Sequence, residues 1–351
     1  MPKKTVTIQA IADAVGVSRN TVSKVINGHP VPIATREKIV EKAIEMGYKG
    51  FAHVQRIDES LPLRLLLLTG RPLSNLDFFL SMIRGIESSI QKYDIDFFQY
   101  TLGPNTTSAQ LKNYIESLAI DGIIGIELYA REHLNHVLSI GTPVVFIDSF
   151  TFMNQMTGNY DVILMEGMQN IYRITTKLIE HGAKTFGFVG DPQHCQGFYE
   201  RYLGMREALF DRGIPFNPSY CILDPDDSPY GDVQWTLSRV ASLDRMPDVF
   251  ICANDSIAIP LVEALKKLYL NIPEDVQVIG FDNITEASLN SPALTTIDID
   301  KEQLGQEIIH TLLQRIKRAT IPNRTIYLRT NIVYRRTTSK RLKQEKSARE
   351  L

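Results

Sequence analysis

The sequence predicts an α/β protein in which a small all-α head precedes a larger body of two lobes. Two observations predict this fold class. The first fifty residues carry apolar side chains at helical spacing and hold no strand-like run. From Leu63 onward, short aliphatic runs alternate with longer helical stretches, a pattern typical of βαβ units and doubly wound, mostly parallel sheets covered on both faces.

The head reads as three short helices. Thr7 is a suitable N-cap for a first helix that ends at Gly16, and Ser18 is a suitable cap for a second. The pair Asn27-Gly28 ends the second helix, and a third helix follows Pro32. Two helices joined by so short a turn predict a helix-turn-helix.

Charge divides the chain in the same way. The whole protein has a net charge of −2, but residues 1–50 carry eight basic residues against four acidic ones. Residues 335–351 carry seven basic residues against two acidic ones, so the body between is strongly acidic. A basic head on an acidic body is a layout that favours nucleic-acid binding by the head.

Polar side chains of the second helix are the candidate contacts to DNA. In a helix-turn-helix, the first turn of the second helix faces base edges in the major groove. Arg19 and Asn20 occupy that turn, and Lys24 lies one turn further. Arginine pairs with guanine and asparagine with adenine. The shorter donors suit phosphate oxygens: Thr7, Ser18, Thr21, Ser23 and Asn27. The alternative is a three-helix core whose polar face is merely solvated.

The body has at least seven candidate strands: 63–69, 94–100, 122–128, 143–148, 184–190, 248–253 and 276–282. Helical stretches fill the gaps between them, at 79–92, 166–181, 199–212 and 255–269. So many strands exceed what one compact lobe needs, and they predict two lobes with a boundary near 150–165.

Long motifs of the chain resemble the LacI/GalR family of bacterial repressors. The head stretches "VSRNTVSKVIN" and "TREKI" carry this resemblance first. It continues through "DGIIGI", "PVVFID", "LIEHGAKTFGFVG", "PDVFICANDSIAI" and "IPEDVQVIGFDN" in the family's order. The resemblance implies a type I periplasmic-binding-protein-like body, a homodimer, and a head that represses transcription at an inverted-repeat operator in double-stranded DNA.

The resemblance also implies a division of the chain. The head is residues 1–50, and the linker is residues 51–61. The N-terminal effector lobe comprises 62–162 plus about 293–323, and the C-terminal lobe comprises 163–292 plus about 324–336. Residues 337–351 form a basic tail of low apolar content, for which the composition predicts disorder.

The linker departs from the family pattern, which is similar to "YxPNxxARxL" and forms a hinge helix that pushes a leucine into the minor groove. Here the stretch is "YKGFAHVQRIDE", with Gly50 at the proline and Ile57 at the leucine. Isoleucine is still an apolar wedge of the kind that unstacks a base step. Two readings stay open: a working hinge helix with Ile57 as a DNA contact, and a plain flexible linker.

Polar residues just past the apolar strands are the candidate effector contacts, because ligands of α/β lobes lie at the carboxyl ends of the strands. Asp148, Asn254, Asp255 and Asp282 occupy such places. By resemblance, Arg201 holds ligand hydroxyls or a carboxylate, and Phe78 and Phe79 line the pocket. Carboxylates, an amide, a guanidinium and an aromatic ring together favour a saccharide effector. Purines and other small metabolites are the alternatives.

Each of these residues also has a purely structural reading. Asp255 would cap the helix that follows it. Asp282 would form a turn with Asn283. Arg201 would pair with Glu200 or Glu207 on the surface.

Other function classes find little support in the sequence. No nucleotide-binding or hydrolase motif is present, and no cofactor or metal is predicted. His133 and His136 have metal-like spacing without an evident third ligand. Three scattered cysteines and a polar amino terminus favour a cytoplasmic protein with no membrane partner. The remaining alternative is a binding protein or enzyme of the same fold whose head has lost its function.

Overall fold

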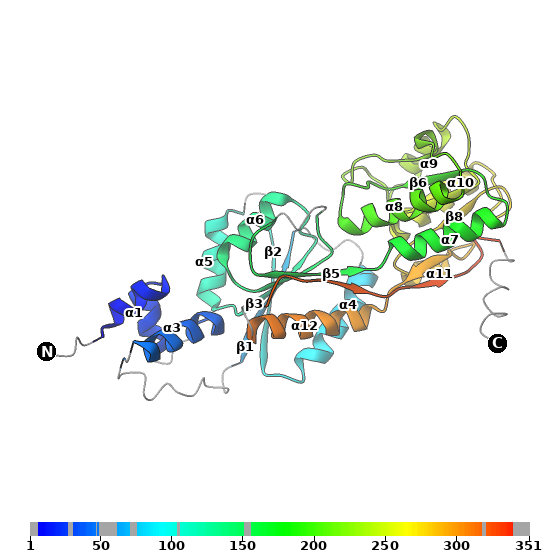
Figure 1. Cartoon of the computed structure of the whole chain (residues 1–351). Coiled ribbons are helices and arrows are strands. Elements are labelled where there is room, and N and C mark those ends of the chain that lie inside the picture. Colours follow the sequence, from blue (N-terminus) through cyan, green and yellow to red (C-terminus); the bar gives the residue numbers. More distant parts are fainter. Residues whose placement is uncertain are drawn as a thin grey trace.

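A helical head and two α/β lobes follow one another along the chain (Figure 1). The computed structural model describes residues 6–26, 31–46, 48, 62–70, 76–103, 106–150, 156–317 and 321–339. Asn27, Ile57, the linker 51–61 and most of the tail lie outside these residues, so the expectations about them stay predictions. Within the described part, no helix is both long and apolar enough to cross a membrane.

The head consists of α1 (Ile8–Val15), α2 (Arg19–Ile26) and α3 (Ile33–Glu45). The Thr7 side chain accepts a hydrogen bond from the backbone of the first turn of α1, and Gly16 ends that helix with φ +78°. The Ser18 hydroxyl accepts from the Thr21 N–H at 3.0 Å and so caps α2. One apolar core joins the three helices, formed by Ile11, Ala12, Val22, Val25, Val31, Ile39 and Ala43. The predicted helix-turn-helix is therefore present.

The first lobe is built on a parallel sheet of order β10-β5-β4-β3-β1-β2. Its strands are β1 (Leu63–Thr69), β2 (Ile95–Thr101), β3 (Gly122–Ile126), β4 (Val144–Ile147), β5 (Tyr160–Met165) and β10 (Thr325–Leu328). One face is covered by α4 (Leu76–Ile90) and α12 (Lys301–Lys317), and the other by α5 (Ser108–Leu118) and α6 (Arg131–Ile140). Gly85 of α4 and Gly305 of α12 let the two backbones touch, since a Cβ on either would clash with the other helix.

The second lobe has a parallel sheet of order β6-β7-β8. These strands are β6 (Phe186–Val189), β7 (Val249–Cys252) and β8 (Gln277–Ile279). The helices of this lobe are α7 (Met168–Glu180), α8 (Gln196–Asp211), α9 (Val233–Ala241), α10 (Asp255–Lys267) and α11 (Thr285–Leu289), with a 3-10 turn at Pro218–Tyr220. An antiparallel pair, β9 (Thr296–Asp298) and β11 (Asn331–Val333), lies beside β8.

The chain passes between the lobes after β5, before α12 and after β10 (Figure 1). At these passages the strand pairing differs from the predicted boundaries. Residues 325–328 were expected in the second lobe, but β10 pairs with β5 in the first sheet. Residue Thr295 was expected in the first lobe, but its carbonyl accepts from the Gly280 N–H at the edge of the second sheet. The sequence of a segment that crosses between the lobes does not show at which residue its hydrogen-bond partners change. The partition as a whole stays a prediction.

Candidate functional site

The helix α2 presents three side chains rich in donors to solvent. Arg19, Asn20 and Lys24 are all exposed, and none of them has a hydrogen-bond or ion-pair partner among the residues that the structure describes. Thr7 and Ser18 are exposed beside them, whereas Thr21 and Ser23 are half-buried. A set of exposed donors on the second helix of a helix-turn-helix is the arrangement that reads base edges.

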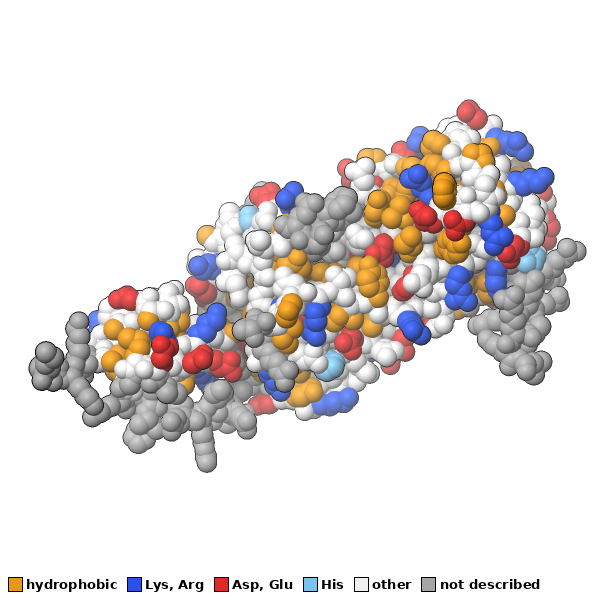
Figure 2. Space-filling model, viewed as in Figure 1, with side chains coloured by type: hydrophobic (Ala, Val, Ile, Leu, Met, Phe, Trp, Pro, Cys, Tyr) orange, Lys and Arg blue, Asp and Glu red, His pale blue; other side chains and the backbone are white. Residues whose placement is uncertain are grey.

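The body offers no comparable surface on the face shown in Figure 2. Lys and Arg side chains are interspersed there with Asp and Glu side chains, so charges of one sign do not gather on the described part of that face. On a surface of mixed charge, the acidic side chains repel a polyanion and offset the attraction of the basic ones. The head is therefore the better candidate for a nucleic-acid surface.

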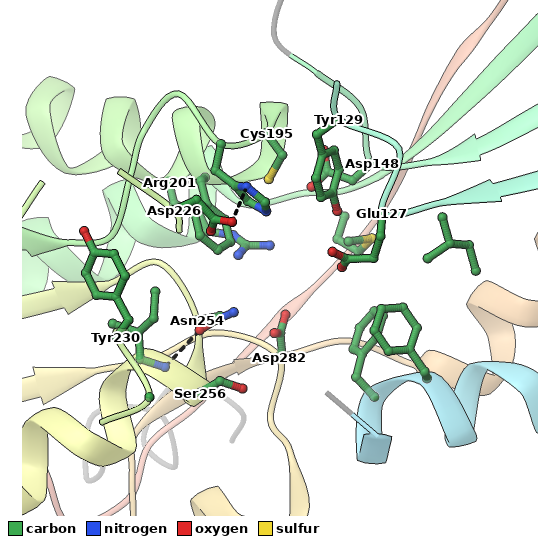
Figure 3. A pocket seen from close by; sticks show the side chains of 18 of the residues that line it. Glu127, Tyr129, Asp148, Cys195, Arg201, Asp226, Tyr230, Asn254, Ser256 and Asp282 are labelled. Atoms are coloured by element: carbon green, nitrogen blue, oxygen red, sulfur yellow. Dashed lines mark hydrogen bonds and ion pairs between the residues drawn. The ribbon is translucent and has the colours of Figure 1, made fainter. Parts of the chain in front are cut away.

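A cavity of about 390 Å³ lies between the two lobes, where the strands of both sheets end. We call it the interlobe cleft. The first lobe lines it from α4 and from the ends of β3, β4 and β5, and the second lobe from α8, the β7–α10 turn and the loop 226–231. Its size is in the range of small-molecule sites. The charged side chains that line it point into its centre (Figure 3).

Asp148 connects the two lobes at the cleft. It follows β4 directly and has φ +57°, an unfavourable conformation for a residue with a side chain. Its Oδ1 accepts from the Ser149 N–H at 2.6 Å and from the Gly197 N–H at 3.1 Å. Gly197 belongs to α8 of the second lobe, and a Cβ there would lie 2.5 Å from Asp148 Oδ2. The Asp148 carboxylate thus links the end of β4 in the first lobe to the start of α8 in the second.

Arg201 of α8 is buried at 2% exposure and lines the cleft. Its guanidinium carbon lies 3.5 Å above the centre of the Phe281 ring, and its Nη1 donates to the Ala253 carbonyl. Its Nε has no hydrogen-bond partner among the described residues. A buried donor without a partner needs one, and a ligand in the cleft would supply it. The alternative pairing with Glu200 is wrong, because Glu200 instead accepts from Gln196 and Tyr327.

Asn254 and Asp255 follow β7, but only Asn254 lines the cleft. The Asn254 Oδ1 accepts from the Ile257 N–H at 3.0 Å, so Asn254 caps α10 and its amide nitrogen remains for a ligand. Asp255 is fully buried and accepts from Thr296 Oγ1 at 2.7 Å and Ile284 N at 3.1 Å. The structure therefore contradicts the expectation that Asp255 contacts the effector. The N-cap residue of α10 is Asn254 rather than Asp255.

Asp282 lines the cleft from the end of β8, with φ +103°. Burial raises the pKa of Asp282 to about 6, although the charges of Arg201 and Lys301 oppose that rise. Burial, and then the charge of Asp282, raise the pKa of Asp255 to about 8. Near neutral pH Asp255 is therefore largely protonated, whereas Asp282 beside the cleft still carries most of its negative charge.

Aromatic side chains line another part of the cleft. Phe78 and Phe79 line it as predicted, with their rings 5.4 Å apart and edge to face. Further residues that line the cleft were not among the effector contacts predicted above: Glu127, Tyr129, His194, Phe198, Asp226 and Tyr230. Glu127 directly follows β3, so the rule that identified Asp148 would have identified it too. His194 Nδ1 and Asp226 Oδ2 form a pair at 3.1 Å. Both residues lie on loops, so the rule based on strand ends does not find them.

Comparison with known proteins decides the family. A model of the LacI family of bacterial regulatory proteins matches residues 7–50, and a model of a periplasmic binding protein-like domain matches residues 175–338. The ribose operon repressor of Haemophilus influenzae is 30% identical over 339 residues, which is 94% of this chain and 97% of that protein. The chain belongs to the LacI family. The HTH-type transcriptional repressor PurR of Pasteurella multocida is 26% identical over 347 residues, 96% of this chain and 99% of that repressor.

Solved structures of LacI-type regulators have the same fold. A complex of the transcriptional regulator CelR with cellobiose matches with a TM-score of 0.68 at 23% identity, over 95% of this chain and 99% of that one. The lac repressor dimer bound to operator and an anti-inducer matches with a TM-score of 0.66 at 22% identity, over 96% and 100%. The predicted family resemblance and fold class are thus confirmed. This LacI-family chain is a DNA-binding regulator of transcription, and its relatives are repressors rather than enzymes.

Proposed function

We propose that this LacI-family protein represses transcription as a homodimer on an inverted-repeat operator, and that a saccharide in the interlobe cleft controls its operator affinity. The observation that carries the proposal is the convergence of Asp148, Arg201, Asn254 and Asp282 on one cavity between the lobes. A ligand that bridges side chains of both lobes has different affinities for open and closed arrangements, and that difference is what a regulatory ligand needs.

The head would read DNA through α2. Arg19 and Asn20 would reach base edges from the first turn, with Lys24 further along the groove. Thr7, Ser18, Thr21 and Ser23 would bond phosphates, and Asn27 and Ile57, outside the described residues, are proposed as further contacts. Two heads related by a two-fold axis require an operator with matching symmetry.

A saccharide suits the chemistry of the cleft. Carboxylates accept hydrogen bonds from neighbouring hydroxyls, and a guanidinium donates to hydroxyl oxygens. The Phe78 and Phe79 rings offer an apolar surface for the C–H face of a sugar. The solved CelR complex holds cellobiose, and a LacI-family regulator from Enterococcus faecium holds ribose. We propose no catalytic step in the cleft.

Operator release tests the whole proposal. A labelled duplex that carries an inverted repeat from the upstream region of the protein's own gene is bound by the purified chain, and monosaccharides and disaccharides are then added singly. At least one saccharide should change the midpoint of the binding isotherm severalfold. Nucleobases are added in parallel. If only they changed the midpoint, the protein would still be a repressor, but its effector would not be a saccharide.

Replacement of Arg19 by alanine should relax the base preference of the head. Loss of a bidentate contact to a base costs about 1–3 kcal/mol of discrimination. We expect affinity for the operator to fall by that amount, while affinity for a scrambled duplex falls much less. Fluorescence anisotropy with both duplexes at two salt concentrations measures the difference.

The matched control for this variant is Arg245→Ala. Arg245 is an exposed arginine between α9 and β7 of the second lobe, so its loss changes the net charge by the same amount. It should alter neither duplex affinity appreciably. If Arg19→Ala lost the same affinity for operator and for scrambled DNA, Arg19 would contact phosphates rather than bases.

A further inference from the structure

We infer that Lys301 couples the effector to the head, because it joins the turn that carries Asp282 in the second lobe to helix α12, which contacts the head. Lys301 does not line the interlobe cleft. It is therefore a positioning residue, which acts through Asp282 and α12. The inference rests on the proposed function, in which a saccharide in the cleft changes operator affinity.

The turn Asp282–Asn283 follows β8 and brings the Asp282 side chain to the cleft. Both residues have positive φ, +103° at Asp282 and +49° at Asn283, a conformation that residues with side chains disfavour. The Asn283 Nδ2 donates to Asp298 Oδ1 at 2.7 Å, and Arg335 donates to Asn283 Oδ1. A strained turn persists only while its surroundings hold it, so a ligand that pulls on Asp282 competes directly with these contacts.

Lys301 connects the first lobe to this turn. It is the first residue of α12, and only 9% of its surface is exposed. Its Nζ donates to the Asn283 carbonyl at 3.2 Å and to the Ile299 carbonyl at 3.4 Å. Burial raises the pKa of Asp282, and the charge of Lys301 opposes that rise, so the ammonium also favours the ionised carboxylate. A change at Asp282 therefore acts on the beginning of α12.

Helix α12 leads from the cleft to the head. It spans Lys301–Lys317, which is about 25 Å at 1.5 Å per residue. Near its far end, the buried Arg315 pairs with Asp161 of β5 and fixes the helix to its sheet. Helix α3 of the head contacts α12, and Figure 1 shows α3 beside the end of α12 that lies farthest from the second lobe. A displacement of Lys301 thus moves α12 together with its sheet, and α3 lies against that unit.

The ratio of operator affinities with and without effector tests the inference. Anisotropy of the labelled operator duplex is measured with no sugar and with saturating D-ribose, D-glucose, D-galactose, D-mannose or cellobiose. Saturation makes the ratio independent of effector affinity, which calorimetry measures separately. Lys301→Met keeps the apolar stem and removes the ammonium. It should bring the ratio about threefold or more closer to one, while operator affinity without sugar stays within about twofold of that of the unchanged protein.

Two further variants separate the loss of coupling from a loss of charge or of folding. Lys301→Arg keeps the charge and a donor at the start of α12, so it should retain most of the effector response. Lys267→Met removes an exposed lysine of α10 in the second lobe and should leave the response unchanged.

Hydrogen exchange of the full chain follows the signal into the head. In the unchanged protein, the sugar that alters operator binding should also alter the exchange of backbone amides in α3 (Ile33–Glu45). In Lys301→Met this alteration should disappear, although calorimetry still detects bound sugar. Because this measurement needs no DNA, it applies even if the variant binds the operator weakly.

The outcomes separate the inference from the proposed function. A full effector response of Lys301→Met overturns the role of Lys301 and leaves the saccharide-controlled repressor in place. An effect of the sugar on α3 that persists in this variant also overturns that role, because the signal then reaches the head through another part of the chain. If no sugar in the panel changes operator binding by the unchanged protein, the saccharide effector fails and the inference fails with it.

Discussion

Arg201→Met should abolish the response of operator binding to the effector while the unliganded protein still binds its operator. The substitution keeps an unbranched apolar stem against Phe281 but removes the only guanidinium of the described cleft lining. Truncation of one partner of a buried, hydrogen-bonded charge pair costs about 2–5 kcal/mol of binding free energy. We therefore expect effector affinity to fall by about 30-fold or more, measured by calorimetry on the variant and by anisotropy of a labelled operator.

Arg206→Met is the control on the same helix. Arg206 lies on α8 as well, but it is exposed and its guanidinium packs over the Tyr202 and Phe216 rings outside the cleft. Its replacement should leave the effector response intact. A full response of the Arg201 variant at the unchanged effector concentration would show that the effector binds elsewhere.

Most strands predicted from the sequence carry a short, dense run of aliphatic or aromatic residues. Six of the observed strands, β1, β3, β4, β6, β7 and β8, lie within the runs identified by their aliphatic residues, and β2 is displaced by one residue. The strand β5 was not predicted because it carries an acid, Asp161, whose charge two arginines distant in the sequence compensate in the core. The strand β10 was missed because it is a half-exposed edge with alternating burial.

The candidate site was predictable where position along a strand decides it. Asp148, Asn254 and Asp282 line the cleft because each follows a strand of a parallel sheet. The same rule failed for Asp255, the first residue of α10, whose side chain turns into the protein under Thr296. The side chains of a two-residue turn point to different sides, and the sequence alone does not say which one faces the ligand.

A buried ion-pair cluster joins β5 of the first sheet to α12. Asp161 of β5 and Arg315 of α12 are both fully buried, with 2.8 Å between Arg315 Nε and Asp161 Oδ2. Arg324 donates to the same carboxylate from its backbone N–H at 2.7 Å and from its Nη2 at 2.9 Å. Burial alone would raise the pKa of Asp161, but the hydrogen bonds and charge of the two arginines outweigh it and hold that pKa below its usual value.

Asp161→Asn should therefore be among the most destabilising conservative changes in the body. It leaves Arg315 buried without a counterion, and removal of one member of a buried pair costs about 3–5 kcal/mol. The control is Asp96→Asn, whose partner Arg64 lies 3.5 Å away in a half-exposed pair on the same sheet. Ion pairs that solvent reaches contribute about 1 kcal/mol or less. Urea unfolding of both variants at one protein concentration measures the difference in the free energy of unfolding, and equal small losses would contradict the role of Asp161.

The pH dependence of the same variant fixes the sign of the effect. The folded protein holds the pKa of Asp161 below its value in the unfolded chain. The ionised carboxylate therefore stabilises the fold at every pH above the unfolded value, and this stabilisation is lost as the pH falls through the folded pKa. The difference in unfolding free energy between the unchanged protein and Asp161→Asn should be largest near neutral pH and should shrink in acid. A difference that grew in acid would mean that Asp161 is protonated in the folded protein, in which case the two arginines would be paired elsewhere.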